Sequence, residues 1–182
     1  MASRRSALLS TLLVSATTLA LLGCNNTRPT EFAPSCPRIA VRADAADITR
    51  YRPGSSGRDL TDLVLDGRIN GFKGGCVRED VKTVKTVLTV DLVLARGPAT
   101  QGRVLSAAYF VAVLDGGQIR DKQVYPLRVE LGENQDQVRI TGQEITLLTQ
   151  VNKEKSAAAY DVVIGFQLNA EEIETNRRRG PR

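Results

Sequence analysis

The strongest structural signal in the sequence is residues 84–95, which run Val-Lys-Thr-Val-Leu-Thr-Val-Asp-Leu-Val-Leu-Ala. Every second residue from 84 to 94 is apolar or threonine, and successive side chains of a strand point to opposite faces of its sheet. β-Branched residues, which favour strands, dominate the segment. The pattern therefore predicts a long strand with one face in the core, ended by Arg96-Gly97-Pro98.

Segments on both sides of this strand are also apolar or alternating and are bounded by turn residues. Residues 104–114 are apolar on both faces, which is typical of a central buried strand. Turns are predicted within 44–57 and at the glycines of 71–75. The other predicted strands are 38–42, 61–70, 119–131, 138–150 and 160–168. About seven strands and little helix predict an all-β fold, an antiparallel β-sandwich, with a small closed β-barrel as the alternative.

One short helix is expected after the last strand. Asn169 and Glu172 have the spacing of a capping box, in which each side chain accepts a hydrogen bond from the other residue's backbone N–H. Early carboxylates and late arginines also suit the helix dipole. The helix is predicted to run to about Arg177. The sandwich domain is therefore assigned to residues 36–176, and 177–182 are expected to be a basic disordered tail.

The N-terminus has the pattern of an export signal. Arg4-Arg5 precede an apolar run, residues 7–22, that is short for a transmembrane helix and diluted by hydroxyl residues. Leu21-Leu22-Gly23-Cys24 resembles the lipobox of bacterial lipoproteins. The resemblance implies that residues 1–23 are a signal peptide, cleaved before Cys24, and that Cys24 is acylated. A secreted protein and an uncleaved anchor are the alternatives.

The lipoprotein resemblance also implies a location in the cell. Asn25 stands where an aspartate would signal retention in the inner membrane of enteric bacteria, so we expect an outer-membrane protein anchored on the periplasmic face. The inner membrane and secretion remain alternatives. The bilayer would be contacted through Cys24, with residues 24–35, polar and rich in proline, as a lipidated tether.

A second resemblance covers most of the mature chain. Cys36-Pro37, residues 57–62 (Gly-Arg-Asp-Leu-Thr-Asp) and residues 165–168 (Gly-Phe-Gln-Leu) are similar to segments of a family of small, uncharacterised proteobacterial envelope lipoproteins. This resemblance implies no activity and no catalytic residues.

The remaining cysteines form an even pair. With Cys24 lipidated, Cys36 and Cys76 are left in an oxidising compartment, where such a pair is typical of a structural disulfide. Two buried free thiols and a redox pair are the alternatives, although no C-x-x-C spacing supports redox chemistry. The expected bridge would join the first strand to the loop before the third.

Charge and composition narrow the classes of function. The chain has 25 basic and 20 acidic residues, but six of the basic residues lie at the two ends, which leaves 19 basic residues in the body. A near-neutral body argues against a nucleic-acid-binding domain. The absence of histidine removes histidine bases, histidine-containing triads and most catalytic zinc sites. No metal or cofactor is expected.

Carboxylates are the remaining candidates for catalysis. Asp62 and Asp66 would share a strand face, about 13 Å apart along the strand, which is too far for a glycosidase pair. Asp91 could approach either from a neighbouring strand. The simpler interpretation is that all three carboxylates solvate an exposed sheet face.

Two function hypotheses follow. The first is a lipid-anchored envelope protein that acts as a non-enzymatic structural or interaction module for a protein or glycan partner. The second is a periplasmic small-ligand carrier, or a hydrolase that uses carboxylates. The C-terminal arginines are interpreted as a solvated tail, with helix-end charges or a weak contact with an anionic surface as alternatives. These arginines are Arg177, Arg178, Arg179 and Arg182.

Overall fold

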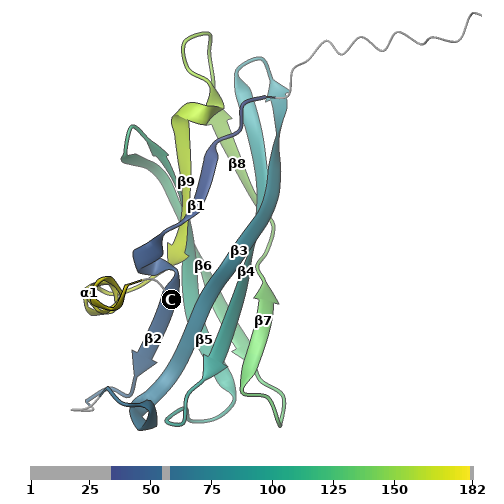
Figure 1. The fold of residues 1–182 in the computed structure, drawn as a ribbon. Coiled ribbons are helices and arrows are strands. Elements are labelled where there is room, and N and C mark those ends of the chain that lie inside the picture. The colour runs from purple at the N-terminus through teal and green to yellow at the C-terminus, as the bar shows by residue number, and fades with distance from the viewer. Residues whose placement is uncertain (1–33, 55–57, 181–182) are drawn as a thin grey trace, which may run out of the picture. The chain divides into compact units, whose positions relative to one another are not determined.

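The chain forms two β-sheets that face each other, as Figure 1 shows. The computed structural model describes residues 34–54 and 58–180. Their strands are β1 (Arg38–Val41), β2 (Asp47–Tyr51), β3 (Leu63–Asp80), β4 (Thr83–Arg96), β5 (Val104–Asp115), β6 (Gln118–Glu130), β7 (Gln137–Thr141), β8 (Ile145–Gln150) and β9 (Tyr160–Phe166). Their helices are the 3-10 turns η1 (Ala43–Ala45), η2 (Leu60–Asp62) and η3 (Ala157–Ala159), and the α-helix α1 (Ala170–Arg179).

The strand order confirms the predicted sandwich. One sheet has the order β1-β9-β5-β6, and the other has β2-β3-β4, with β7 and β8 both paired along the remaining edge of β4. The pairings are antiparallel apart from β1 with β9, which is parallel. The described strands stay in two separate sheets, so the closed-barrel alternative is wrong.

Strand β4 supplies one wall of the core, as its alternation predicts. Leu88, Val90, Leu92 and Leu94 are all at most 1% exposed. The facing sheet contributes Tyr109 from β5 and the alternating apolar residues of β9, which are equally buried. Burying such side chains stabilises the fold by roughly 1.5–3 kcal/mol each, so the core is held by these two inner faces.

The structure has nine strands in its described part, where the sequence predicted about seven. Strand β2 lies inside the region predicted as turns, because Asp47 and Arg50 obscure its alternation. The segment predicted as one strand, 138–150, is divided into β7 and β8. Between them, the Gly142 N–H donates to the Val90 carbonyl at 2.8 Å, so the backbone stays attached to β4.

Strand β3 also departs from the prediction. It begins after the η2 turn and continues through the glycines that were predicted to form a turn, so that prediction is wrong. The pairing with β4 shifts register between Ile69 and Gly71. Gly71 has a φ of 155°, a conformation that favours glycine. The glycine therefore absorbs a bulge within the strand rather than ending it.

Helix α1 has the predicted capping box. Asn169 Oδ1 accepts from the Glu172 N–H, and Glu172 Oε2 accepts from the Asn169 N–H, both at 2.8 Å. The helix continues to Arg179, so the tail predicted for residues 177–182 is wrong for Arg177, Arg178 and Arg179. Arg182 lies outside the described residues.

The predicted disulfide between Cys36 and Cys76 is present. Its position differs from the expectation, because Cys76 lies within strand β3 and not in a loop. The bond therefore joins the segment before β1, on one sheet, to an edge of the other sheet. The disulfide links the two sheets at the edge where β1 and β3 lie.

Candidate functional site

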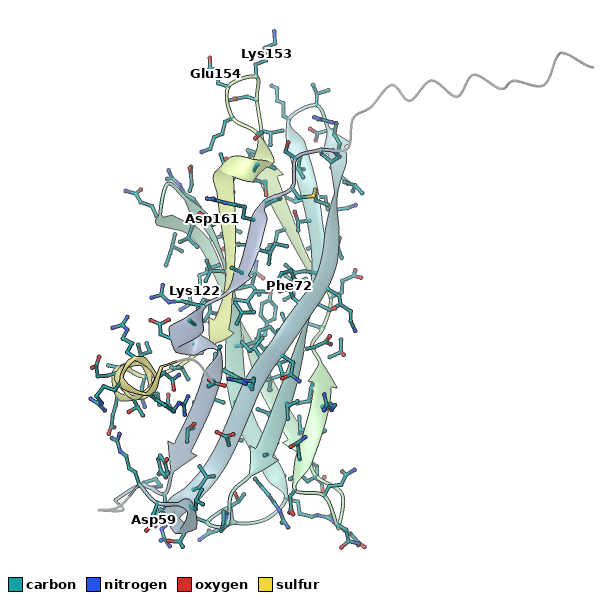
Figure 2. All side chains as sticks on the ribbon, viewed as in Figure 1. Asp59, Phe72, Lys122, Lys153, Glu154 and Asp161 are labelled. Carbon is teal, nitrogen blue, oxygen red and sulfur yellow. A yellow bond between two sulfur atoms is a disulfide. The ribbon has the colours of Figure 1, made fainter. Side chains whose placement is uncertain are left out.

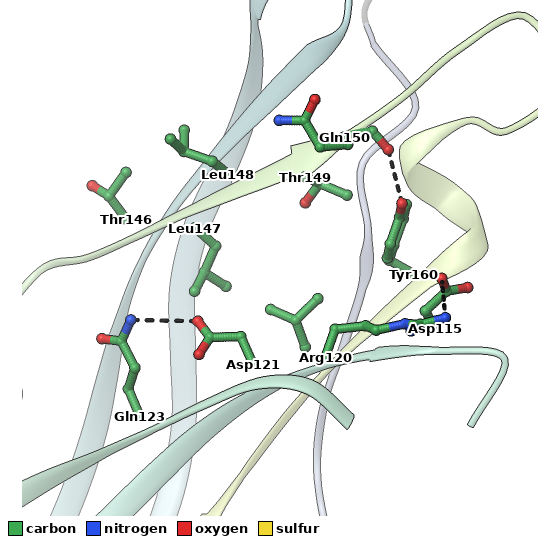
Figure 3. Close-up of a pocket in the computed structure, with 11 residues that line it drawn as sticks. Asp115, Arg120, Asp121, Gln123, Thr146, Leu147, Leu148, Thr149, Gln150 and Tyr160 are labelled. Carbon is green, nitrogen blue, oxygen red and sulfur yellow. Dashed lines mark hydrogen bonds and ion pairs between the residues drawn. The ribbon is translucent and has the colours of Figure 1, made fainter. Parts of the chain in front are cut away.

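The candidate site is a pocket on the opposite side of the sandwich, between the edge strands β6 and β8 (Figure 3). Its volume is about 460 Å³, within the 300–1,000 Å³ range usual for ligand sites. The loop that carries Lys153 and Glu154 follows Gln150 of the pocket and lies at the top of Figure 2. Eleven residues line the pocket: Val113, Asp115, Arg120, Asp121, Gln123, Thr146, Leu147, Leu148, Thr149, Gln150 and Tyr160.

The pocket exists because the inner face of β6 changes character along the strand. Tyr125 lies opposite Tyr109 in the pairing with β5, and the two rings stack at 5.1 Å. Residues opposite one another in an antiparallel pair share a face, so Gln123 and Asp121 lie on the same inner face as Tyr125. Because these two side chains are polar, they do not seal the gap to β8 as apolar residues would.

Most of the charge in the pocket is paired. Asp115 contacts Lys155 Nζ at 2.6 Å and Arg120 Nη2 at 3.2 Å. The hydrogen bond from Lys155 is the main cause that lowers the pKa of Asp115, against a smaller opposing effect of burial. The same hydrogen bond raises the pKa of Lys155. Asp115 therefore stays ionised at neutral pH.

Tyr160 closes one end of the pocket. Its hydroxyl donates to the Gln150 carbonyl at 2.9 Å, which links β9 of one sheet to β8 of the other. Lys155 Nζ lies 4.4 Å from the centroid of the Tyr160 ring, a cation–π distance. The pocket therefore has a fixed end wall with its polar groups already satisfied.

The carboxylates considered in the sequence do not come together. Asp62 lies in η2, not on a strand face as predicted, and it is ion-paired with Arg52. Asp66 accepts a hydrogen bond from Thr49 Oγ1 at 3.0 Å. Asp91 contacts Thr141 and Lys73 on the outer face of the second sheet. The proposed approach of Asp91 to either of the others is wrong, because each carboxylate has its own partners.

The arginines of α1 hold the helix against the domain. Arg177 Nη2 lies 3.1 Å from Asp44, and Arg179 Nη2 lies 3.4 Å from the buried carboxylate of Asp47. Arg178 contacts only Glu174, at 3.9 Å on the same helix, among the described ion pairs. Contact of these arginines with an anionic surface stays a prediction.

The pocket residues were missed in the sequence, although a signal was present. Asp121 and Gln123 occupy the same alternating positions as Tyr125 and Leu127, so the change from polar to apolar within one face was visible. Nothing in the sequence showed that β8 would lie across from that face, because strand order depends on the whole fold.

We expect stability to be almost independent of pH between about pH 5.5 and 8. The chain has no histidine, and the pKa values of Asp44, Asp59, Asp91 and Asp115 are lowered, first by side-chain hydrogen bonds. A lowered pKa contributes stability above the unfolded value, about 3.9, and this is lost as pH falls through the folded value. Urea unfolding followed by circular dichroism at stepped pH values checks this.

A change in the urea midpoint within that neutral range would contradict the expectation. It would reveal a group whose pKa differs between the folded and unfolded chain, and a carboxyl group with a raised pKa, the property of a general acid, is one such group. The measurement therefore also bears on whether the pocket can catalyse a reaction.

The described residues contain no cluster of three or more cysteine, aspartate or glutamate side chains placed to hold a metal ion. In the same part of the chain, no helix is both long and apolar enough to cross a bilayer. The predicted signal peptide, Cys24 and nearly all of the tether precede the described residues. Comparisons with protein-family models, curated proteins and solved structures found no match for this chain.

Proposed function

We propose that this chain is a lipid-anchored protein of the bacterial cell envelope that acts as a binding module and not as an enzyme. The anchor is supported by the lipobox residues and Cys24. The binding role is supported by one structural observation: a polar pocket opens between β6 and β8, while the core beside it is closed by apolar side chains. The bilayer and an envelope protein or glycan are its partners.

The charges of the pocket favour binding over carboxylate catalysis. Asp115 is held by two cations, and its lowered pKa keeps it ionised, so it is a poor proton donor near neutral pH. Asp121 is bonded to the Gln123 amide, with Nε2 and Oδ2 3.4 Å apart. A hydrolase of this type needs one carboxyl group held protonated beside one held ionised.

The predicted address can be tested by replacing residues 1–24 with a cleavable signal peptide that carries no lipobox. Each buried CH₂ of an acyl chain contributes about 0.8 kcal/mol, so the multiply acylated native chain is expected in the outer-membrane fraction and the replaced chain in the soluble periplasm. Density-gradient fractionation and the mass of the N-terminal peptide measure this. Asn25→Asp provides the matched control, expected to move the chain to the inner membrane.

The same variant separates a binding module from a diffusible enzyme or carrier. In a strain that lacks the gene, the native chain should restore the phenotype of the parent strain. The unacylated variant, released into the periplasm with its disulfide, should not, because an anchored module depends on its position. Full restoration by the released domain would contradict the proposal. Native protein that is soluble and unmodified at Cys24 would contradict the anchor itself.

A further inference from the structure

Three buried hydroxyl groups of the described residues lack a hydrogen-bond partner, and one of them lines the pocket. They belong to Thr86, Tyr109 and Thr149. Thr149 is 2% exposed and lines the space between β6 and β8 (Figure 3), whereas Thr86 and Tyr109 do not line it. A buried polar group without a partner is unfavourable, so the Thr149 hydroxyl would gain from a ligand that can both donate and accept.

A second polar group faces the same space in a fixed orientation. The Tyr125 hydroxyl donates to Gln123 Oε1 at 2.8 Å, and the Gln123 amide nitrogen lies 3.4 Å from Asp121 Oδ2. This chain of hydrogen bonds leaves Oδ1 of Asp121 with no partner among the described residues. The pocket thus offers a carboxylate acceptor from β6 opposite a hydroxyl from β8.

The net charge of the site limits the class of ligand. Asp115 and Asp121 contribute two negative charges, and Arg120 and Lys155 contribute two positive charges at the same end of the sandwich. Because these charges cancel, the site offers no strong net attraction to an anion or a cation. Its preference should be for an uncharged ligand rich in hydrogen-bonding groups.

The remaining walls are apolar. Val113 from β5 and Leu147 from β8 approach from opposite sheets. The Leu148 side chain lies on the outer face of β8 and is 62% exposed (Figure 3). A ligand that fits this site needs hydroxyl groups toward Asp121, Arg120 and Thr149 and C–H groups toward the apolar side chains. Sugar rings have this arrangement, with hydroxyls at the rim and C–H bonds on the faces.

We propose that the pocket between β6 and β8 binds an uncharged saccharide, with Thr149 and Asp121 as its principal hydrogen-bonding residues. This inference rests on the proposed binding function and specifies the class of its ligand. The saccharide can be a free sugar or a unit of an envelope glycan, and both present the same chemistry to the site.

The test uses the purified full-length chain in a detergent that has no sugar headgroup. In one arm, chitobiose and maltose, two neutral disaccharides, are titrated while the methyl NMR signals of Thr149, Leu147 and Val113 are followed. In the other arm, the chain is sedimented with purified cell-wall glycan sacculi. Saturable shifts in the first arm identify a free sugar, and cosedimentation in the second identifies a polymer.

Two variants of the same chemistry provide the control. Thr149→Val removes the hydroxyl in the pocket and is expected to weaken binding about tenfold, the effect of losing one hydrogen bond. Thr86→Val removes an equally buried hydroxyl outside the pocket lining and is expected to leave binding unchanged. Both variants should unfold no more readily than the native chain, because each loses an unpaired polar group.

Several results would overturn the proposal. They are no saturable binding in either arm, equal weakening by the two variants, and tighter binding of glucosamine or glucuronic acid than of the neutral sugars. Since this experiment does not depend on acylation or location, it can fail while the anchor at Cys24 is upheld, and the reverse is equally possible.

Discussion

Loss of the Cys36–Cys76 disulfide is expected to lower the free energy of unfolding by about 4 kcal/mol. The two cysteines are 40 residues apart, and a crosslink that closes a loop of this length removes conformational entropy from the unfolded chain. The short strand next to the bond also suggests that the bond stabilises the fold. Strand β1 has four residues and, in the described structure, pairs with a single strand, β9.

The measurement is urea unfolding of the native chain with and without a reducing agent, compared with the Cys36→Ser/Cys76→Ser variant. Reduction of the native chain and the double substitution should give the same lower midpoint, and reductant should not affect the variant. Equal stability of the native and double-serine chains would show that the bond contributes nothing.

Because any force on the predicted tether reaches the domain just before β1, the bond would also transfer that force to β3.

The sequence predicted the parts of this fold that depend on local pattern. Strand β4 alternates over its whole length because one face is buried against the other sheet, so its position could be inferred without knowing its neighbours. The disulfide was predicted from the cysteine count and the expected oxidising compartment. The capping box of α1 was visible because both of its side chains act on backbone atoms within one helical turn.

The parts that were missed depend on distant residues. β2 was predicted as a turn because an aspartate is unsuited to a buried strand position, and Asp47 is accommodated there by ion pairs that include those with Arg68 and Arg179. The glycines of β3 have the composition of a turn, yet all of them pair with β4, with a bulge at Gly71 and regular register at Gly74 and Gly75. To predict the pocket, one would have to know that β6 and β8, which are not consecutive strands, lie across from each other.

Substitution of Asp47 by alanine is expected to lower the free energy of unfolding by about 3 kcal/mol, at the lower end of the range for breaking a buried ion pair. Asp47 is 2% exposed, and its carboxylate accepts from Arg68 Nε at 2.8 Å while Arg179 lies 3.4 Å away. Without the carboxylate, both guanidinium groups lose this ion pair. Both arginine side chains are about one third exposed, at 39% and 31%, and can turn toward water, which limits the loss.

Asp47 also fixes the position of α1. Its backbone carbonyl accepts from Asn176 Nδ2 at 2.8 Å, and the same amide donates to the Asp44 carbonyl at 3.1 Å. Arg179 binds the Asn176 side-chain oxygen at 2.9 Å as well as the Asp47 carboxylate. The helix and strand β2 are thus joined through one buried polar cluster, so that Asp47→Ala should loosen the helix together with the strand.

A matched control exists on the same domain. Asp161 pairs with Arg38 at 2.9 Å, but these side chains are 37% and 74% exposed, so Asp161→Ala should change stability by less than about 1 kcal/mol. Urea unfolding compares the two variants, and an Asp47→Ala/Arg179→Ala double-mutant cycle isolates the helix contribution. If Asp47→Ala were no more destabilising than Asp161→Ala, the cluster would not anchor the helix. Independent behaviour of Asp47 and Arg179 in the cycle would lead to the same conclusion, and Arg179 would then be available for the anionic contact predicted for the C-terminal arginines.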